Sequence, residues 1–293
     1  FDKKSQLNAM EICCDAIMIL GERYAAYARE LAEKETDETR KKELLQIAAN
    51  CDVVPAHKPQ TYWQAIQMYW FVHLGTITEL NGWDAMSPGH IDQHLAPFYE
   101  KGLADGTLTR ESAKELLSCL WVKVNNTPAP PKVGVTAAES GTYNDFTNIN
   151  LGGLKVDGSD GSSEVTYICL EIFDELRLLQ PQGNIQVSER TPDNVLRAAA
   201  RVFRNGMGYP SMFNADMVIQ EQMRVGKTLE DARQGGTSGC IETGCAGKEA
   251  YLLHGYLNVP KLLEYTLSNG VDLLTGKQVS IKTGDISTFK TFD

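Results

Sequence analysis

The residues best suited to chemistry are Cys240 and Glu242, which lie close together in a glycine-rich run at residues 235–248. Five glycines fall in this run, and glycine loses more backbone entropy than other residues when it enters a helix or strand. We therefore expect a tight, irregular backbone path there. Such a path can hold a thiol and a carboxylate in a fixed relation, so Cys240 and Glu242 are the candidate reactive pair.

The neighbouring carboxylate limits what the Cys240 thiol can do. A negative charge raises the pKa of a thiol, whereas a cysteine hydrolase needs that pKa lowered, so papain-like hydrolysis is disfavoured. A thiyl radical needs no thiolate, and a carboxylate beside it can act as a base on the same substrate. A buried cysteine that only packs is equally compatible with the residues.

Other polar residues suggest further kinds of site, each less favoured than the pair Cys240 and Glu242. Cys245 allows a redox pair or half a zinc site, but no second Cys/His pair with zinc-finger spacing follows, so we expect no metal site. His90 and His94 have the spacing of two ligands on one helix face, yet they lack the Glu of the zincin motif, which favours hydrogen bonding and packing. Asp84, between Trp83 and Met86, is either a helix cap, which the sequence favours, or a desolvated acid.

Composition excludes several classes of protein. The chain has 293 residues and a net charge of -10, which disfavours a nucleic-acid or anionic-membrane surface. We expect no membrane-spanning helix and no signal peptide. The seven cysteines are irregularly spaced, which is typical of a reducing cytoplasm. Because the sequence begins without Met and stops after a loop-like stretch, we expect a segment of a longer protein.

The elements that position the loop follow from hydrophobic periodicity. Residues 5–50 read as one long helix, and the helix at 61–74 is apolar on nearly all sides, which predicts burial. Strands are expected at 132–136, 148–151, 184–188 and 210–214, with helices at 163–179, 193–205 and 260–268. Strands that alternate with helices indicate an α/β fold, helical over 1–127 and mixed over 128–293.

The stretch Gly239-Cys240-Ile241-Glu242 closely resembles the GCxE signature of the thiyl loop in glycyl radical enzymes, the pyruvate formate-lyase-like family. The likeness extends through residues 235–248 and includes 61–74, 81–95, 128–153 and 210–214, so it covers essentially the whole chain. It implies an α/β barrel of ten strands, arranged as two antiparallel half-barrels surrounded by helices. This chain would be an internal segment of that one barrel domain, without the C-terminal glycyl radical domain.

The resemblance also implies an activity. A radical S-adenosylmethionine activase would install a radical on a glycine outside this chain, and the radical would pass to Cys240. The stretches at residues 51–59 and 235–240 are most similar to the branch of the family that dehydrates trans-4-hydroxy-L-proline to pyrroline-5-carboxylate. In that branch the thiyl takes a hydrogen from the carbon next to the ring nitrogen, and the neighbouring hydroxyl leaves as water. No bound cofactor is implied, and the full-length protein is expected to be a homodimer.

The resemblance also implies roles for individual residues, each at a position that matches a site residue of the family. Glu242 matches the base of the family, and Asp84 matches a second carboxylate that would engage the substrate hydroxyl. Phe146 and Tyr256 match positions that shape the ring pocket, and Ser140 would contribute through its backbone. Apart from the resemblance, these last three would be read as core aromatics and a turn serine.

Two other functions stay open on the sequence. Other branches of the family share the GCxE loop, so a glycerol or propanediol dehydratase, or a choline or sulfonate lyase, is an alternative. From a different class, the chain is a non-catalytic structural or binding segment in which the loop serves only the fold.

Overall fold

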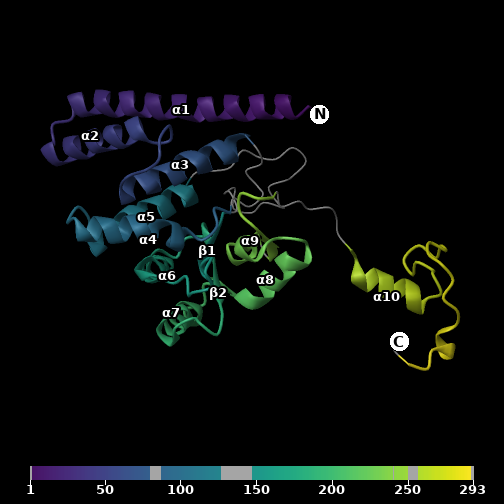
Figure 1. The fold of residues 1–293 in the computed structure, drawn as a ribbon. Helices are drawn as coiled ribbons and strands as arrows, with labels where there is room; N and C mark the ends of the chain where they lie inside the picture. The colour runs from purple at the N-terminus through teal and green to yellow at the C-terminus, as the bar shows by residue number, and fades with distance from the viewer. Residues whose placement is uncertain (1, 80–86, 127–146, 240, 250–256, 292–293) are drawn as a thin grey trace. The chain divides into compact units, whose positions relative to one another are not determined.

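The computed structural model describes residues 2–79, 87–126, 147–239, 241–249 and 257–291. The chain divides into two compact units, Phe1–Tyr251 and Leu252–Asp293, and each is described by itself. The first unit carries the helices α1 to α9, the parallel sheet and the glycine-rich run (Figure 1).

The chain opens with two long helices that pack against each other, α1 (Lys3–Lys34) and α2 (Glu38–Val53). The prediction of one continuous helix over residues 5–50 is wrong at Glu35–Asp37. There the Asp37 carboxylate accepts hydrogen bonds from the backbone N–H groups of Thr39 and Arg40, each at 2.8 Å. An aspartate in this N-cap position stabilises the start of a new helix, so the chain can turn back on itself. Arg29 of α1 forms an ion pair with Asp52 of α2 across the pair of helices.

A second group of helices lies between α1 and the sheet, and consists of α3 (Tyr62–Glu79), α4 (Ile91–Ala104) and α5 (Arg110–Asn126). The predicted burial of the apolar helix is confirmed, since Tyr62, Trp70 and Phe71 are all buried. Phe71 packs with α1 and α2, whereas Tyr62 and Trp70 belong to the main hydrophobic core. α3 therefore joins the outer helices to the interior.

The sheet is built from two successive strand–helix–strand units. Its elements are β1 (Asn148–Gly152), α6 (Glu164–Leu176), β2 (Gln182–Val187), α7 (Asp193–Arg204) and β3 (Ser211–Asn214). The strands are parallel in the order β1-β2-β3, as expected when each pair is joined by a crossover helix. The predicted strands at 148–151, 184–188 and 210–214 are confirmed, and the α/β fold with them. The strand predicted at 132–136 lies outside the described residues.

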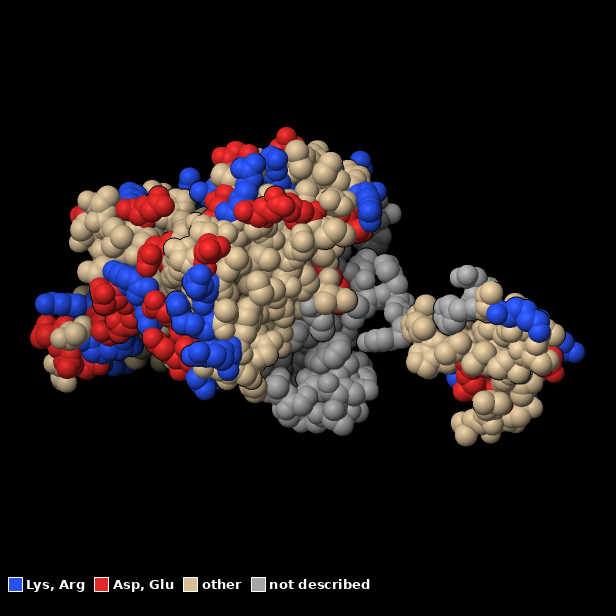
Figure 2. All heavy atoms as spheres, turned by 90° about the horizontal axis from the view of Figure 1, so that it is seen from below, with Lys and Arg blue, Asp and Glu red and all other residues tan. Residues whose placement is uncertain are grey.

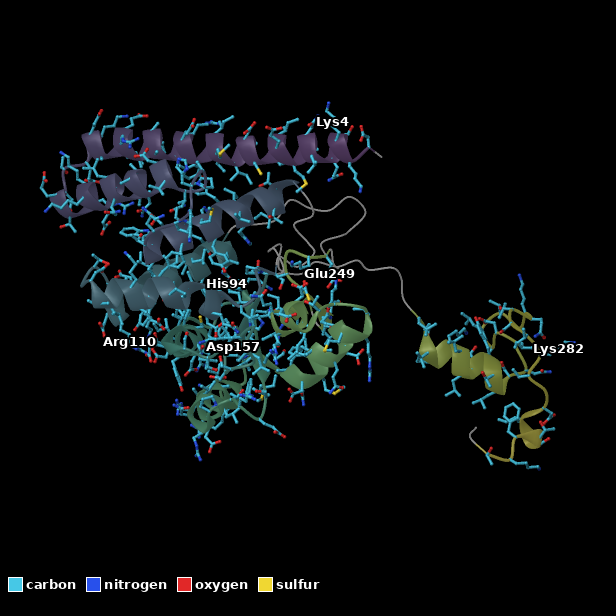
Figure 3. All side chains as sticks on the ribbon, viewed as in Figure 1. Lys4, His94, Arg110, Asp157, Glu249 and Lys282 are labelled. Carbon is cyan, nitrogen blue, oxygen red and sulfur yellow. The ribbon has the colours of Figure 1, made fainter. Side chains whose placement is uncertain are left out.

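The main core fills the space between the helices and one face of the sheet. Its strand residues are Ile149, Leu151 and Ile185, each at most 2% exposed. They pack among side chains of α3 to α7. A salt-bridge network on the surface ties α5 to α6, where Arg110 pairs with Glu164 and Glu171 (Figure 3). The core thus covers one face of the sheet and does not include the opposite face.

After β3 the chain forms α8 (Ala215–Arg224) and α9 (Leu229–Arg233), and then β4 (Gly236–Ser238) and β5 (Glu242–Gly244). The second unit contains α10 (Val259–Leu267) and the short 3₁₀ helix η1 (Ile286–Thr288). Within that unit Lys261 forms ion pairs with Glu264 and Asp272. Over the described parts of the chain, none of the helices combines the length and hydrophobicity needed to span a bilayer. On the face drawn in Figure 2, acidic and basic side chains are interspersed.

Candidate active site

The glycine-rich run folds into a β-hairpin, with β4 and β5 antiparallel and Ser238 opposite Glu242. The expectation of an irregular backbone is therefore wrong for these two short strands. It is confirmed at the turn between them, where Gly239 has a φ of +55°. The strands form despite their glycines because the Asn150 side chain of the parallel sheet makes two hydrogen bonds to the backbone of β4. These bonds offset the entropy that the glycines lose.

Glu242 folds back over the turn that precedes it. Its Oε2 accepts a hydrogen bond from the backbone N–H of Ile241 at 3.0 Å. A Cβ added to Gly239 would lie only 2.5 Å from the same oxygen, so the carboxylate occupies space that any other residue would need. Ile241 at the tip is 72% exposed, whereas Glu242 is half-buried. The hairpin therefore holds a carboxylate against the turn residues Gly239 and Ile241.

The base of the hairpin is held by a buried histidine. His90 stands beside β1, paired with Asn150, and its Nε2–H donates to the Gly235 carbonyl at 3.1 Å. Burial lowers the pKa of His90, so the ring is neutral. His94 instead bonds the hydroxyl of Tyr69 in α3, and burial lowers its pKa too (Figure 3). The interpretation of both histidines as hydrogen-bonding residues is confirmed.

Cys245 at the end of the hairpin is buried and packs. Its Sγ lies 3.2 Å from the Asp231 carbonyl oxygen, and burial raises the pKa of the thiol. Glu249 accepts a hydrogen bond from the Cys245 N–H at 2.9 Å and pairs with Lys227 at 3.1 Å (Figure 3). Among the residues that the structure describes, no cluster of three or more His, Cys, Asp or Glu side chains is suited to a metal ion.

Of the six expected site residues, the structure describes Glu242. The other five, Cys240, Asp84, Ser140, Phe146 and Tyr256, lie outside the described residues. Two of the segments that contain these residues, 80–86 and 127–146, are followed in the chain by described residues that contact the hairpin. The Ser87 hydroxyl donates to the Thr237 carbonyl at 3.0 Å, and the Asn148 amide donates to the Gly239 carbonyl at 2.5 Å.

Amide side chains of the sheet are the part of the site that sequence reasoning missed. Asn148, Asn150, Asn184 and Gln186 all donate hydrogen bonds to the hairpin. The signal is present in the sequences Asn-Ile-Asn-Leu and Asn-Ile-Gln-Val, in which amides alternate with apolar residues. That alternation places all the amides on one face of the strands. Nothing local reveals that this face binds the loop.

The chain is similar in sequence and in structure to known proteins. The chain is 59% identical to the trans-4-hydroxy-L-proline dehydratase of Clostridioides difficile over all of its 293 residues, which cover 37% of that protein. The crystal structure of the hydroxyproline dehydratase from Clostridioides difficile, with trans-4-hydroxy-L-proline bound, superposes with a TM-score of 0.92 and 60% identity. That match covers 99% of this chain and 37% of the crystallised one.

A more distant structure supports the same fold. A glycyl radical enzyme from Archaeoglobus fulgidus matches with a TM-score of 0.82 and 33% identity, over 92% of this chain and 35% of its own. The expected fold class is therefore confirmed. The pyruvate formate lyase-like family matches residues 1–293, that is, the entire chain. The chain belongs to the pyruvate formate lyase-like family.

Proposed function

We propose that this chain is a segment of a glycyl radical dehydratase that removes water from trans-4-hydroxy-L-proline and forms pyrroline-5-carboxylate. The observation that carries the proposal is the 59% identity, along the whole chain, to a trans-4-hydroxy-L-proline dehydratase. The substrate-bound structure of similar identity adds support. The same proposal includes a radical S-adenosylmethionine activase, a homodimeric full-length enzyme and a cytoplasmic location.

The hairpin fits a glycyl radical carried by another part of the protein. A glycyl radical would supply the unpaired electron that makes a cysteine reactive. Thr237 at the base is fully buried while Ile241 at the tip is 72% exposed, so the tip is open to a second protein segment. The base is rigidly bonded to the sheet, so an approaching segment meets a tip that is held in place.

In the proposed reaction Cys240 removes a hydrogen atom from the carbon next to the ring nitrogen. Glu242 then takes a proton from the ring nitrogen, and Asp84 donates a proton to the hydroxyl on the neighbouring carbon, which leaves as water. The Cys240 thiol returns its hydrogen to that neighbouring carbon. The substrate loses one water in total, and proton exchange resets the two carboxyl groups.

The two carboxyl groups need opposite protonation states, which requires different surroundings. Glu242 is half-buried, beside a hairpin tip that is open to water. Asp84 is preceded by Trp83, the kind of neighbour that desolvates a carboxyl group and favours its protonated form. We further propose that Phe146 and Tyr256 shape the ring pocket and that Ser140 contributes its backbone.

The test replaces the reacting atom. In the full-length enzyme, activated by its activase, Cys240→Ser is expected to abolish formation of pyrroline-5-carboxylate while electron paramagnetic resonance still detects the glycyl radical. Substantial turnover by this variant would remove Cys240 from the mechanism.

A second measurement addresses the substrate. The activated wild-type enzyme is incubated separately with hydroxyproline, glycerol, propanediol and choline, and the products are analysed. Only hydroxyproline is expected to be converted. Conversion of another compound in its place would keep the radical chemistry but refute the substrate.

A further inference from the structure

Four buried amide side chains cover one face of the parallel sheet, and we call them the amide face: Asn148 and Asn150 of β1 with Asn184 and Gln186 of β2. The register of the strands aligns Asn150 with Asn184. Alternate residues of a strand point to opposite faces, so the neighbours Ile149, Leu151 and Ile185 face the apolar core. The sheet thus has one hydrocarbon face and one amide face.

Burying amides is unfavourable unless they are hydrogen-bonded. An amide without a partner costs about 1–3 kcal/mol in a protein interior. A sheet covered on both faces is normally apolar on both. The amide face must therefore have partners that apolar residues cannot satisfy, and those partners are in the hairpin.

The amide face contacts alternate residues of the hairpin. Gln186 donates to the Gly235 carbonyl at 2.9 Å, and Asn148 donates to the Gly239 carbonyl at 2.5 Å. Between them Asn150 and Asn184 both bond to Thr237. The Gly239 carbonyl belongs to the peptide group that joins Gly239 to Cys240. The bonds therefore run along the chain as far as the cysteine's own peptide group.

Asn150 makes the most complete of these contacts. Its Oδ1 accepts from the Thr237 N–H and its Nδ2 donates to the Thr237 carbonyl, both at 2.8 Å. This is the pattern by which one strand residue bonds another, so the side chain takes the place of a neighbouring strand. A Cβ on Gly236 would lie 2.8 Å from Asn150 Oδ1, so the close approach depends on that glycine. Both Asn150 and Thr237 are fully buried.

Asn148 adds an independent sign that the amide face serves more than stability. Its Oδ1 is buried and has no hydrogen-bond partner among the described residues. An unsatisfied buried oxygen costs about 1–3 kcal/mol. Among the described residues, this cost falls on the amide that bonds the Gly239 carbonyl, in the peptide group shared with Cys240.

We propose that Asn150 is a positioning residue for Cys240, because its carboxamide holds both backbone groups of Thr237 and so sets the place of the turn three residues later. The inference rests on the proposed function, in which Cys240 is the reacting residue. Hydrogen transfer requires reacting atoms within about 3–3.5 Å, and a displacement of about 1 Å can lower a rate about 100-fold. Asn150 acts through the backbone of the hairpin, to which both ends of its carboxamide are bonded.

The decisive variant is Asn150→Asp in the activated full-length enzyme. The carboxylate keeps the acceptor for the Thr237 N–H but sets a second oxygen against the Thr237 carbonyl. Protonation of the new carboxyl group restores a donor there. Burial favours the protonated form, so kcat should rise as the pH falls from about 8 to about 6. In the described part of the chain the titratable groups around this position are His90, Asp92 and Glu242, and the pH profile of the wild-type enzyme corrects for them.

The matched control is Asn50→Asp, another buried amide, which lies in α2 and bonds Gln46. For Asn150→Asp at about pH 8 we expect kcat to fall about 100-fold, with KM within about twofold and the glycyl radical signal retained. Asn50→Asp should keep its kcat and show no new pH dependence. Equal kcat values for Asn150→Asp and wild type, or equal losses in both variants, would overturn the inference.

A substrate-independent measurement separates this inference from the proposed function. Hydrogen exchange of the backbone amides at residues 236–239 is slow if the amide face holds them, and it should accelerate in Asn150→Asp but not in Asn50→Asp. If wild type fails to convert hydroxyproline yet this difference appears, the proposed function is wrong and the positioning role stands. If exchange is unchanged, the positioning role is wrong whatever the substrate.

Discussion

Gly239 and Glu242 share the same small space at the tip of the hairpin. A Cβ at position 239 would lie 2.5 Å from Glu242 Oε2, and the φ of +55° is one that other residues adopt only with strain. The glycine is thus required by the position of the carboxylate as well as by the turn. Because of this contact, a substitution at residue 239 should displace the carboxylate of Glu242, the proposed base.

We expect Gly239→Ala to displace Glu242 and lower kcat by about 100-fold, the lower end of what a general base contributes. The measurement is the turnover of the activated full-length enzyme, with the radical signal as a check of folding. Gly247→Ala is the control, because Gly247 has a similar φ of +74° but no atom of the described residues within 4 Å of its Cβ position. Equal losses in both variants would mean that backbone strain, and not the carboxylate, is responsible.

Asp92 is a buried carboxyl group at the start of α4. It accepts hydrogen bonds from the Gly152 N–H at 2.8 Å and the Thr166 hydroxyl at 2.6 Å, and so joins α4 to β1 and α6. Burial nevertheless dominates and raises the pKa of Asp92 to about 7. Tyr69 and Cys169, which face it from α3 and α6, have raised pKa values through burial and are neutral.

The raised pKa makes stability depend on pH. The native state binds the Asp92 proton more tightly than the unfolded chain, whose aspartates have a pKa of about 3.9, so this stabilisation is complete below about pH 4 and is lost as the pH rises through 7. Between about pH 5.5 and 8 the free energy of unfolding should fall by about 2 kcal/mol more in wild type than in Asp92→Asn. Urea unfolding at the two pH values measures this. The exposed Asp157 provides the control Asp157→Asn, which should behave as wild type (Figure 3).

At the scale of elements, β2 and α6 meet through a glycine and a phenylalanine. A Cβ on Gly183 would lie 2.5 Å from the ring of Phe173, which is almost completely buried. The ring lies between Trp121 and Tyr209, so it has aromatic neighbours that restrict any movement. This contact sets how closely the crossover helix approaches the sheet.

Gly183→Ala should therefore destabilise the protein by about 1–3 kcal/mol through overpacking. Phe173→Leu removes ring atoms and makes room for the new methyl group. The double variant should lose less stability than the sum of the losses in the two single variants, as measured by the midpoints of urea unfolding. Additive effects would show that the two residues are not in strained contact.

Elements were predictable where the signal was local. The strands at 148–151, 184–188 and 210–214 follow from short strand-like segments set among Gly, Pro and Ser turns, and the structure confirms them. The break between α1 and α2 was missed, although Asp37 is a residue type that caps helices. No apolar residue lies between Ala32 and Leu44, so the spacing of apolar residues does not show where one helix ends and the next begins.

At the scale of the whole molecule, the described residues include a strand edge and several apolar side chains that are exposed. Among the described residues β3 pairs with β2 on one side only, and most of its residues are exposed, including Met212. In the second unit, Leu257, Leu274 and Ile281 are more than two-thirds exposed. Exposed edges and apolar side chains of this kind promote association.

We therefore expect the 293 residues, expressed alone, to aggregate. Light scattering after size-exclusion chromatography at about 10 µM measures this. Met212→Lys places a charge on the exposed edge and should reduce the aggregated fraction, since charges on edge strands oppose pairing. A monodisperse monomer of the unmodified chain would contradict the expectation.

The sequence by itself indicated the type of fold and predicted the chemistry of the loop. A turn glycine, a cysteine and a glutamate are adjacent in the chain, so their proximity needs no tertiary contact. The alternation of strands and helices is likewise a local pattern. The resemblance of these residues to one family led to the remaining site positions, of which Glu242 is the one that the structure describes.

Tertiary structure alone decided what holds the loop. Asn150 and Thr237 are 87 residues apart in the chain, and Asn148 and Gly239 are 91 apart. Amides on a strand usually indicate a solvated face, and their sequence does not say which segment will cover them. Only the folded chain brings the hairpin onto the amide face, because the bonds that satisfy these buried groups exist only after the sheet and the hairpin have met.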